Sequence, residues 1–166
     1  MPLIQEQFFD IGANLTHESF TKDLDSVITE ASKLGVKRLS VTGSSVKDSL
    51  EAFEITQRYP KSCISTAGIH PHNAKEYSPA AFSEIKDLLK NDLVKSIGET
   101  GLDFNRNFSS PEDQQKSFEA HLELSIELNK PLFLHERDAH EKFVEITSQY
   151  LKDLPKSVVH CFTGTE

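Results

Sequence analysis

The sequence predicts an α/β fold in which βα units repeat around a parallel sheet. Short β-rich apolar runs alternate with amphipathic segments of about 12 to 20 residues, which is the pattern of such units. No Gly/Ser linker or break in composition divides the chain, so we expect residues 1–166 to form one domain. A length of 166 residues with 37% hydrophobic and 27% charged residues suits a globular protein that buries a core.

The expected elements follow one another as strand and helix along the whole chain. The expected strands are Phe8 to Leu15, Val36 to Gly43, Cys63 to His70, Leu93 to Glu99, Leu132 to His135 and Val158 to Phe162. The expected helices are Lys22 to Leu34, Val46 to Tyr59, Pro79 to Lys90, Pro111 to Asn129 and His140 to Lys152. Eight units of this kind close a (β/α)₈ barrel. Six strands and five helices therefore predict an incomplete barrel, cut short at its carboxyl end, with an unpaired strand edge.

Residues at the element boundaries support these assignments. Gly35 follows the first helix where a C-cap glycine is common, and Pro79 and Pro111 each follow a serine that can cap a helix. Two stripes at helical spacing predict core faces, and their members are Leu24, Val27, Ile28, Ala31 and Leu34 in the first helix and Phe118, Leu122 and Ile126 in the fourth.

Composition limits the kinds of function. Eighteen basic and twenty-six acidic residues give a net charge of −8, which argues against binding of polyanions by a broad basic face. No run approaches the roughly 18 apolar residues of a membrane span, and the first residues lack the pattern of a secretory signal, so a cytoplasmic location is expected. Cys63 and Cys161 form no CxxC pair and are expected to be buried, reduced thiols.

Polar residues follow four consecutive expected strands. In parallel α/β folds the carboxyl ends of the strands meet at one rim, where active sites are built. Glu99, His135 and His160 are a carboxylate and two imidazoles on different strands, which are ligands that suit a divalent cation with open positions for water and substrate. These ligands alone do not distinguish hydrolysis of phosphodiesters from hydrolysis of amides.

Structural roles are alternatives for the same residues. Taken singly, His135 or His160 on an apolar strand is more often a core histidine, whereas a carboxylate such as Glu99 after an apolar strand needs a partner if it is buried. His70 and His72 flank Pro71, and a contact to phosphate or metal-bound water and a hydrogen bond within the turn are equally good interpretations.

The remaining histidines and two arginines give weaker indications. Arg106 and Arg137 each have the geometry to bind a phosphate, although an ion pair of Arg137 with Asp138 explains that residue equally well. The histidines of helical or helix-leading segments are expected to be surface or packing residues, and these are His17, His121 and His140.

Five motifs in this order resemble the TatD family of metal-dependent deoxyribonucleases. They are Phe9-Asp10-Ile11-Gly12-Ala13-Asn14-Leu15, Gly68-Ile69-His70-Pro71-His72, Gly98-Glu99-Thr100-Gly101-Leu102-Asp103, His135-Glu136-Arg137-Asp138-Ala139 and His160-Cys161-Phe162-Thr163-Gly164. The similarity runs from about Phe8 to the last residue. Together the five motifs are far more specific than a single glycine or histidine pattern.

The resemblance implies a distorted TIM barrel of the amidohydrolase-like superfamily and a magnesium-dependent nuclease that removes nucleotides from the 3′ end of single strands. Mn²⁺ and Zn²⁺ are alternatives to Mg²⁺. The matching positions imply Glu99, His135 and His160 as metal ligands. Further cleft residues implied by the motifs, with catalytic roles, are His70, His72, Asp103 and Arg137.

Two departures from the family pattern stand out. Most of the wider family has a His-x-His pair at the end of the first strand, where this chain has Gly12 and Asn14, which puts a two-metal site in doubt and points to the TatD subgroup. Family members are also longer and carry a late aspartate, as a further ligand and base, that no residue here matches.

Three functional hypotheses follow. The first is a metal-dependent 3′ to 5′ exonuclease that acts on DNA, with RNA as a further substrate, and that has a role in DNA repair. The second is a metal hydrolase of a small amide, lactone or phosphoester, and the third is an inactive fragment. A full-length form is expected to be monomeric, whereas the open sheet edge of this chain permits association with a second copy.

Overall fold

Six parallel strands form one sheet in the order of the sequence. The structure, a computed structural model, describes residues 7–163. Each strand pairs in parallel with the next one along the chain, in the order β1-β2-β3-β4-β5-β6. The strands are β1 (Phe8–Ala13), β2 (Val36–Val41), β3 (Cys63–Ala67), β4 (Val94–Asp103), β5 (Leu132–Arg137) and β6 (Val158–His160).

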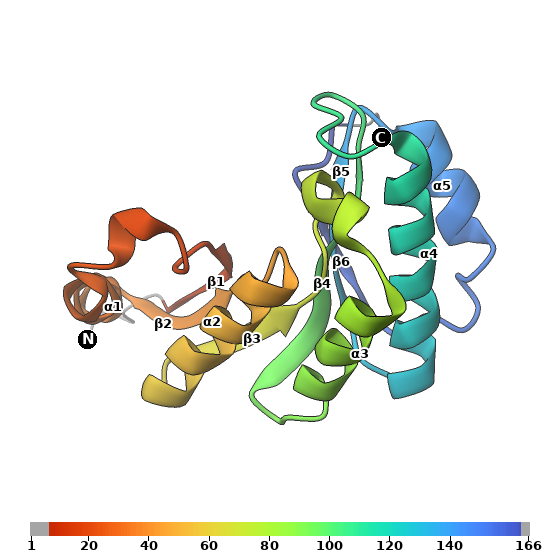
Figure 1. The fold of residues 1–166 in the computed structure, drawn as a ribbon. Coiled ribbons are helices and arrows are strands. Elements are labelled where there is room, and N and C mark those ends of the chain that lie inside the picture. The colour runs from red at the N-terminus through yellow and green to blue at the C-terminus, as the bar shows by residue number, and fades with distance from the viewer. Residues whose placement is uncertain (1–6, 164–166) are drawn as a thin grey trace, which may run out of the picture.

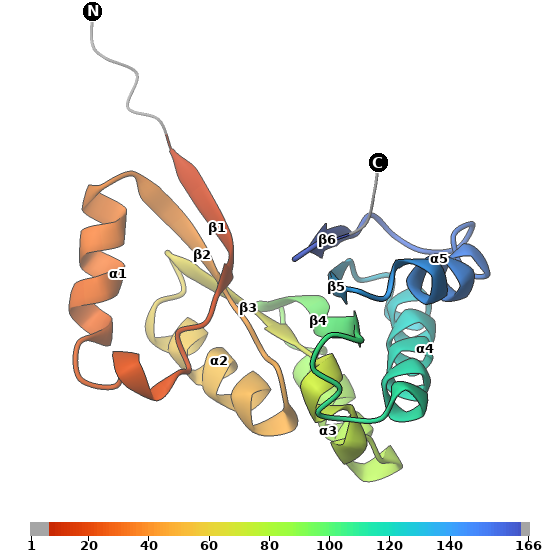
Figure 2. The same ribbon diagram turned by 90° about the horizontal axis from the view of Figure 1, so that it is seen from above.

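Helices connect the successive strands. They are α1 (Leu24–Lys33), α2 (Val46–Arg58), α3 (Pro79–Leu88), α4 (Pro111–Leu128) and α5 (His140–Ser148), and two short 3₁₀ helices, η1 (Glu18–Phe20) and η2 (Pro71–Glu76), precede α1 and α3. The strands curl into an arc that begins at β1 and ends at β6, with the helices on its outer side (Figures 1 and 2). The predicted incomplete (β/α) barrel is confirmed.

The expected helix boundaries hold where a capping residue sets them. Ser78 Oγ accepts a hydrogen bond from Ala81 N–H at 3.2 Å, and Ser110 Oγ accepts one from Asp113 N–H at 3.1 Å, each with proline as the next residue. These bonds satisfy amides that have no partner within the first turn. Gly35 follows α1 and its C-cap residue with φ 103°, a conformation that glycine adopts without strain.

The fourth strand is longer than predicted, and two glycines lie within it. Expected to end at Glu99, β4 continues to Asp103 and pairs with β5 along that extension. A Cβ at Gly98 would lie 2.2 Å from Phe133 O, and one at Gly101 would lie 2.0 Å from His135 O. The glycines therefore allow a close approach of two strands, which brings Asp103 to the site within a strand.

Two predicted burials were wrong, in both cases because the element ends earlier than expected. Leu34 is 81% exposed, since α1 ends at Lys33 and Leu34 lies beyond its packed face, where Ile28 is buried. Cys161 is exposed because β6 ends at His160 and the chain turns away there, with φ 51° at Cys161. Cys63 is buried as predicted, and burial raises the pKa of its thiol to about 11.

The core lies mainly between the sheet and its outer helices. Phe118 and Leu122 of α4 are fully buried against β4 and β5, in a cluster with Leu102 and Leu132. The concave side of the sheet carries an apolar groove of ≈ 280 Å³ with Phe9 and Phe133 among its lining residues. Residues from all six strands line the groove, but none of the histidines or carboxylates of the polar rim described next is among them.

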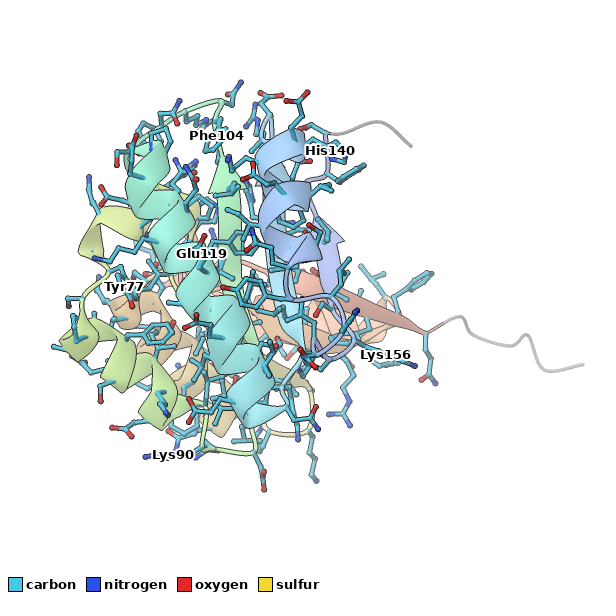
Figure 3. The ribbon with its side chains drawn as sticks, turned by 90° about the vertical axis from the view of Figure 1, so that its right-hand side faces the viewer. Tyr77, Lys90, Phe104, Glu119, His140 and Lys156 are labelled. Atoms are coloured by element: carbon cyan, nitrogen blue, oxygen red, sulfur yellow. The ribbon has the colours of Figure 1, made fainter. Side chains whose placement is uncertain are left out.

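The carboxyl ends of the strands form one end of the molecule. Phe104 follows β4 and His140 begins α5, and both lie at that end, whereas Lys90 and Lys156 lie at the opposite end (Figure 3). Functional side chains at strand ends therefore share one rim, as expected for a barrel. Among the described residues, no helix has the length and apolar character needed to cross a membrane.

Candidate metal centre

The rim gathers the three residues that the sequence predicts as metal ligands. Glu99 lies in β4, His135 in β5 and His160 in β6. The parallel register pairs His135 with Gly101 on one side and with His160 on the other, so the three side chains reach one point. His70 joins them from the segment that follows β3.

Glu99 is the centre of this cluster. Its Oε1 atom lies near three imidazole nitrogens, at 2.5 Å from His160 Nε2, 2.9 Å from His135 Nδ1 and 3.4 Å from His70 Nε2. Glu99 and His70 are each only 9% exposed, and His135 is 6% exposed. A buried carboxylate needs such partners, so the cluster accounts for Glu99 being tolerated inside the protein.

The donor set fits a divalent cation. His70, Glu99 and His135 each offer one ligand atom, and these atoms all lie within 4.8 Å of one another. His135 Nε2 is buried and makes no hydrogen bond to any described residue. Imidazole and carboxylate donors held on rigid strands suit a first-row divalent metal. His160, the third predicted ligand, is outside this set of three but contacts the same carboxylate oxygen.

Electrostatics keep the carboxylate ionised and the adjacent imidazole neutral. Burial opposes ionisation of Glu99, but hydrogen bonds from His135, His160 and His70 outweigh burial and hold its pKa well below the usual range. Burial lowers the pKa of His70, and the Glu99 carboxylate only partly offsets that effect. Ionised carboxylate and neutral imidazole are the protonation states that bind metals.

A second pair extends the cluster along the rim. His72 Nε2 lies 2.7 Å from Asp103 Oδ2, and the same oxygen lies 3.4 Å from His135 Nε2. Asp103 is 1% exposed; burial raises its pKa, but the Arg106 N–H and the His72 ring outweigh burial and lower it. His72 and Asp103 are thus adjacent to the candidate ligands, in positions that suit a proton acceptor or donor.

Arg137 lies at the same rim. One interpretation of this residue was an ion pair with Asp138, which the described residues do not form. Arg137 ends β5, is partly buried, and its carbonyl accepts a hydrogen bond from Phe104 N–H at 3.0 Å. No ion pair joins Arg137 to Asp138 within residues 7–163. Asp138 Oδ2 instead accepts a hydrogen bond from Asn105 Nδ2 at 2.7 Å, which leaves the Arg137 side chain to other partners.

Glu136 supports the rim, and the sequence interpretation assigned it no role. This fully buried carboxylate accepts hydrogen bonds from Ala139 N–H at 2.9 Å and from Thr163 N–H at 3.1 Å. It therefore joins the start of α5 to the segment that follows β6 and His160. In the sequence, Glu136 is a charged residue directly after the expected strand Leu132 to His135, which does not reveal a backbone partner 27 residues away.

His121, predicted to be a surface or packing residue, is buried and anchors the segment that carries His70. Its buried ring accepts a hydrogen bond from Ile69 N–H at Nε2 (3.2 Å) and donates from Nδ1 to Ser117 O (2.6 Å). This arrangement requires a neutral ring. Burial lowers the pKa of His121 to about 4, and the hydrogen bond to Ser117 O only partly opposes the effect.

Acidification is therefore expected to destabilise the chain through His121. The folded state binds this proton more weakly than the unfolded state, whose histidine pKa is about 6.5, so the stabilisation is present above pH 6.5 and declines as the pH falls towards 4. Between pH 7.5 and pH 5 the loss is about 2 kcal/mol. Urea unfolding at both pH values measures it. His121→Gln is expected to lack this share of the pH dependence, and an unchanged pH dependence in the variant would contradict the assignment.

Comparisons with known proteins identify the family of the chain. A family model described as TatD related DNase matches residues 9–166. The chain is 46% identical over 157 residues to a Salmonella typhimurium protein named 3′-5′ ssDNA/RNA exonuclease TatD, and 48% identical over 157 residues to the protein of that name from Erwinia billingiae. Both alignments cover 95% of this chain and 60% of the relative, so the chain spans about 60% of the length of these relatives.

Solved structures show the same fold. A hydrolase of the TatD family from Entamoeba histolytica superposes with a TM-score of 0.88 at 30% identity, over 96% of this chain and 60% of that one. An uncharacterized amidohydrolase from Saccharomyces cerevisiae superposes with a TM-score of 0.86 at 28% identity, over 96% of this chain and 63% of that one. The curled six-stranded sheet is thus similar to a large part of these proteins.

Proposed function

Because the chain belongs to the TatD related DNase family, we propose that it acts in a metal-dependent exonuclease that hydrolyses phosphodiester bonds of single-stranded DNA, and of RNA, from the 3′ end. The cluster of His70, Glu99 and His135 at the strand ends is the observation that carries this proposal. The 46% identical relative is named a 3′-5′ ssDNA/RNA exonuclease, which supports the choice of substrate.

The metal would be held by Glu99, His135 and His160, with His70 close enough to contribute. A divalent cation bound among such donors supplies a Lewis acid and lowers the pKa of a bound water. Glu99 remains ionised and His70 neutral, so neither must lose a proton before binding. Asp103 and His72, whose Oδ2 and Nε2 atoms lie 2.7 Å apart, are proposed to accept a proton from the attacking water and to pass it to solvent.

The proposed metal is Mg²⁺, as the family resemblance implies. Imidazole nitrogens also suit Mn²⁺ and Zn²⁺, whereas Mg²⁺ prefers oxygen ligands. The activity of the chain in the three ions must therefore be compared to identify the metal. The net charge of −8 offers no general attraction for a polyanion. Local cations such as Arg137 and Arg106 are therefore proposed to contact the phosphates of the substrate.

We propose that this activity is cytoplasmic. β1 and β6 each pair with one strand among the described residues, so each has an edge at which a second copy of the chain can pair. We propose that the protein is monomeric when further polypeptide of the same protein covers these two edges.

Release of nucleotides from 3′-labelled single-stranded DNA tests the proposed function. We expect release by the 166-residue chain in Mg²⁺, none in EDTA, and none by Glu99→Ala. Mn²⁺ and Zn²⁺ are tested in parallel to identify the metal. Intact DNA in all three metals, together with hydrolysis of a small phosphoester or amide, would favour the alternative hydrolase, and no turnover of any substrate would favour an inactive fragment.

A further inference from the structure

An exposed aromatic ring lies at the edge of the candidate metal centre. Phe108, in the loop between β4 and α4, is 57% exposed. The rings of Phe108 and His72 form a T-shaped pair, with centroids 4.8 Å apart and planes at 81°. His72 in turn contacts Asp103 at 2.7 Å, so the ring is two contacts away from the buried cluster.

The loop that carries Phe108 is held in place by hydrogen bonds at both of its ends. Asp103 Oδ1 accepts hydrogen bonds from Asn105 N–H and Arg106 N–H at 3.0 and 3.1 Å. The fully buried side chain of Gln114 donates to Asp103 O at 3.1 Å and to Ser109 O at 3.0 Å. The residue next to Phe108 is thus fixed to a helix of the core.

A third set of bonds ties the loop to the segment after β3. Ser109 Oγ donates to His72 O at 2.9 Å and accepts a hydrogen bond from Lys75 N–H at 3.0 Å. Phe108 is therefore presented to solvent by an ordered support beside a candidate catalytic residue. A large apolar ring that is exposed in such a place has a functional explanation if the ring binds another flat apolar group.

Two cations accompany the ring. Lys75 is exposed, and its Nζ lies 3.5 Å from the Phe108 carbonyl oxygen, while Arg106 is exposed two residues before the ring. An aromatic ring next to cations is the arrangement with which proteins bind single-stranded nucleic acids, since bases stack on the ring and phosphates contact the cations. A paired duplex does not offer a free base face to such a ring.

We propose that Phe108 is a stacking platform for an unpaired base of the single strand whose 3′-terminal phosphodiester bond lies at the metal centre, with Lys75 and Arg106 at the adjacent phosphates. This inference rests on the proposed function and deepens it, because it names the residue that selects single strands. The ring acts on binding of the base and takes no part in the chemical step.

Binding of two oligonucleotides tests the platform. One is a fluorescein-labelled single-stranded DNA, and the other has the same sequence with abasic residues in its last two 3′ positions. Titrations use the full chain with Ca²⁺ in place of Mg²⁺, and the DNA is checked to be intact afterwards. We expect Phe108→Leu to weaken binding of the first by about 10-fold and binding of the second by less than about 2-fold. Phe8→Leu, which changes a phenylalanine of 53% exposure in β1, is the matched control and is expected to change neither.

The outcomes separate this inference from the proposed function. Equal weakening on both oligonucleotides would mean that Phe108 only supports His72, and it would overturn the platform, as would unchanged binding or no binding by the unsubstituted chain. Base-dependent binding in a chain that releases no nucleotide in Mg²⁺, Mn²⁺ or Zn²⁺ would support the platform and contradict the exonuclease.

Discussion

Replacing Glu99 by Gln is expected to lower the affinity of the chain for Mn²⁺ by about 100-fold or more. Loss of even an outer partner of a metal ligand costs about 10- to 100-fold, and Glu99 is the one carboxylate that all three imidazoles face. Glutamine keeps the size of the side chain but has no negative charge to offset that of the metal. Isothermal titration with Mn²⁺ measures the affinity directly.

The control for this substitution removes a charge elsewhere. Glu84→Gln is the same Glu to Gln replacement at an exposed position of α3, and this variant is expected to bind Mn²⁺ like the unsubstituted chain. Far-ultraviolet circular dichroism of both variants checks that the fold is kept. Equal Mn²⁺ affinity in Glu99→Gln and Glu84→Gln would show that Glu99 is not a metal ligand.

Replacing Gly101 by Ala is expected to have the largest effect on stability. A Cβ at this position would lie 2.0 Å from His135 O, a backbone atom of the neighbouring strand, and Gly101 has φ 142°. Neither the clash nor the backbone strain can be relieved by a side-chain rotation. We expect a loss of about 4 kcal/mol or more in the free energy of unfolding, measured by urea denaturation.

A second glycine provides the comparison. A Cβ at Gly12 would meet Phe133 Cζ at 3.0 Å, which is the far end of a side chain, and Gly12 has no positive φ. Gly12→Ala is therefore expected to cost about 1 kcal/mol. If Gly101→Ala and Gly12→Ala unfolded at the same urea concentration, this result would contradict the close approach of β4 to β5 at Gly101.

Much of the site follows from local sequence and topology together. The alternation of strands and helices predicts a parallel sheet, and a parallel sheet brings Glu99, His135 and His160 to one rim. The distances around Glu99 agree with that prediction. His70 was predicted as a cleft residue with a catalytic role and not as a metal ligand. Its grouping with Glu99 and His135 depends on how the segment after β3 turns, which no pattern in the sequence specifies.

The parts that the sequence did not predict depend on contacts between distant segments. Two glycines within six residues usually indicate a turn, whereas Gly98 and Gly101 allow β4 to lie close to β5. Glu136 accepts a hydrogen bond from Thr163 N–H, 27 residues along the chain, and Gln114 donates one to Asp103 O, 11 residues back. Hydrophobic periodicity carries no information about such polar contacts.

A crystal structure of the chain with Mn²⁺ would locate the metal. We expect an anomalous difference peak for Mn²⁺ at the rim, within ligand distance of Glu99, His135 and His160 or His70. A peak elsewhere on the surface, or no peak at an Mn²⁺ concentration that saturates binding in solution, would contradict the assignment of a metal centre to these residues.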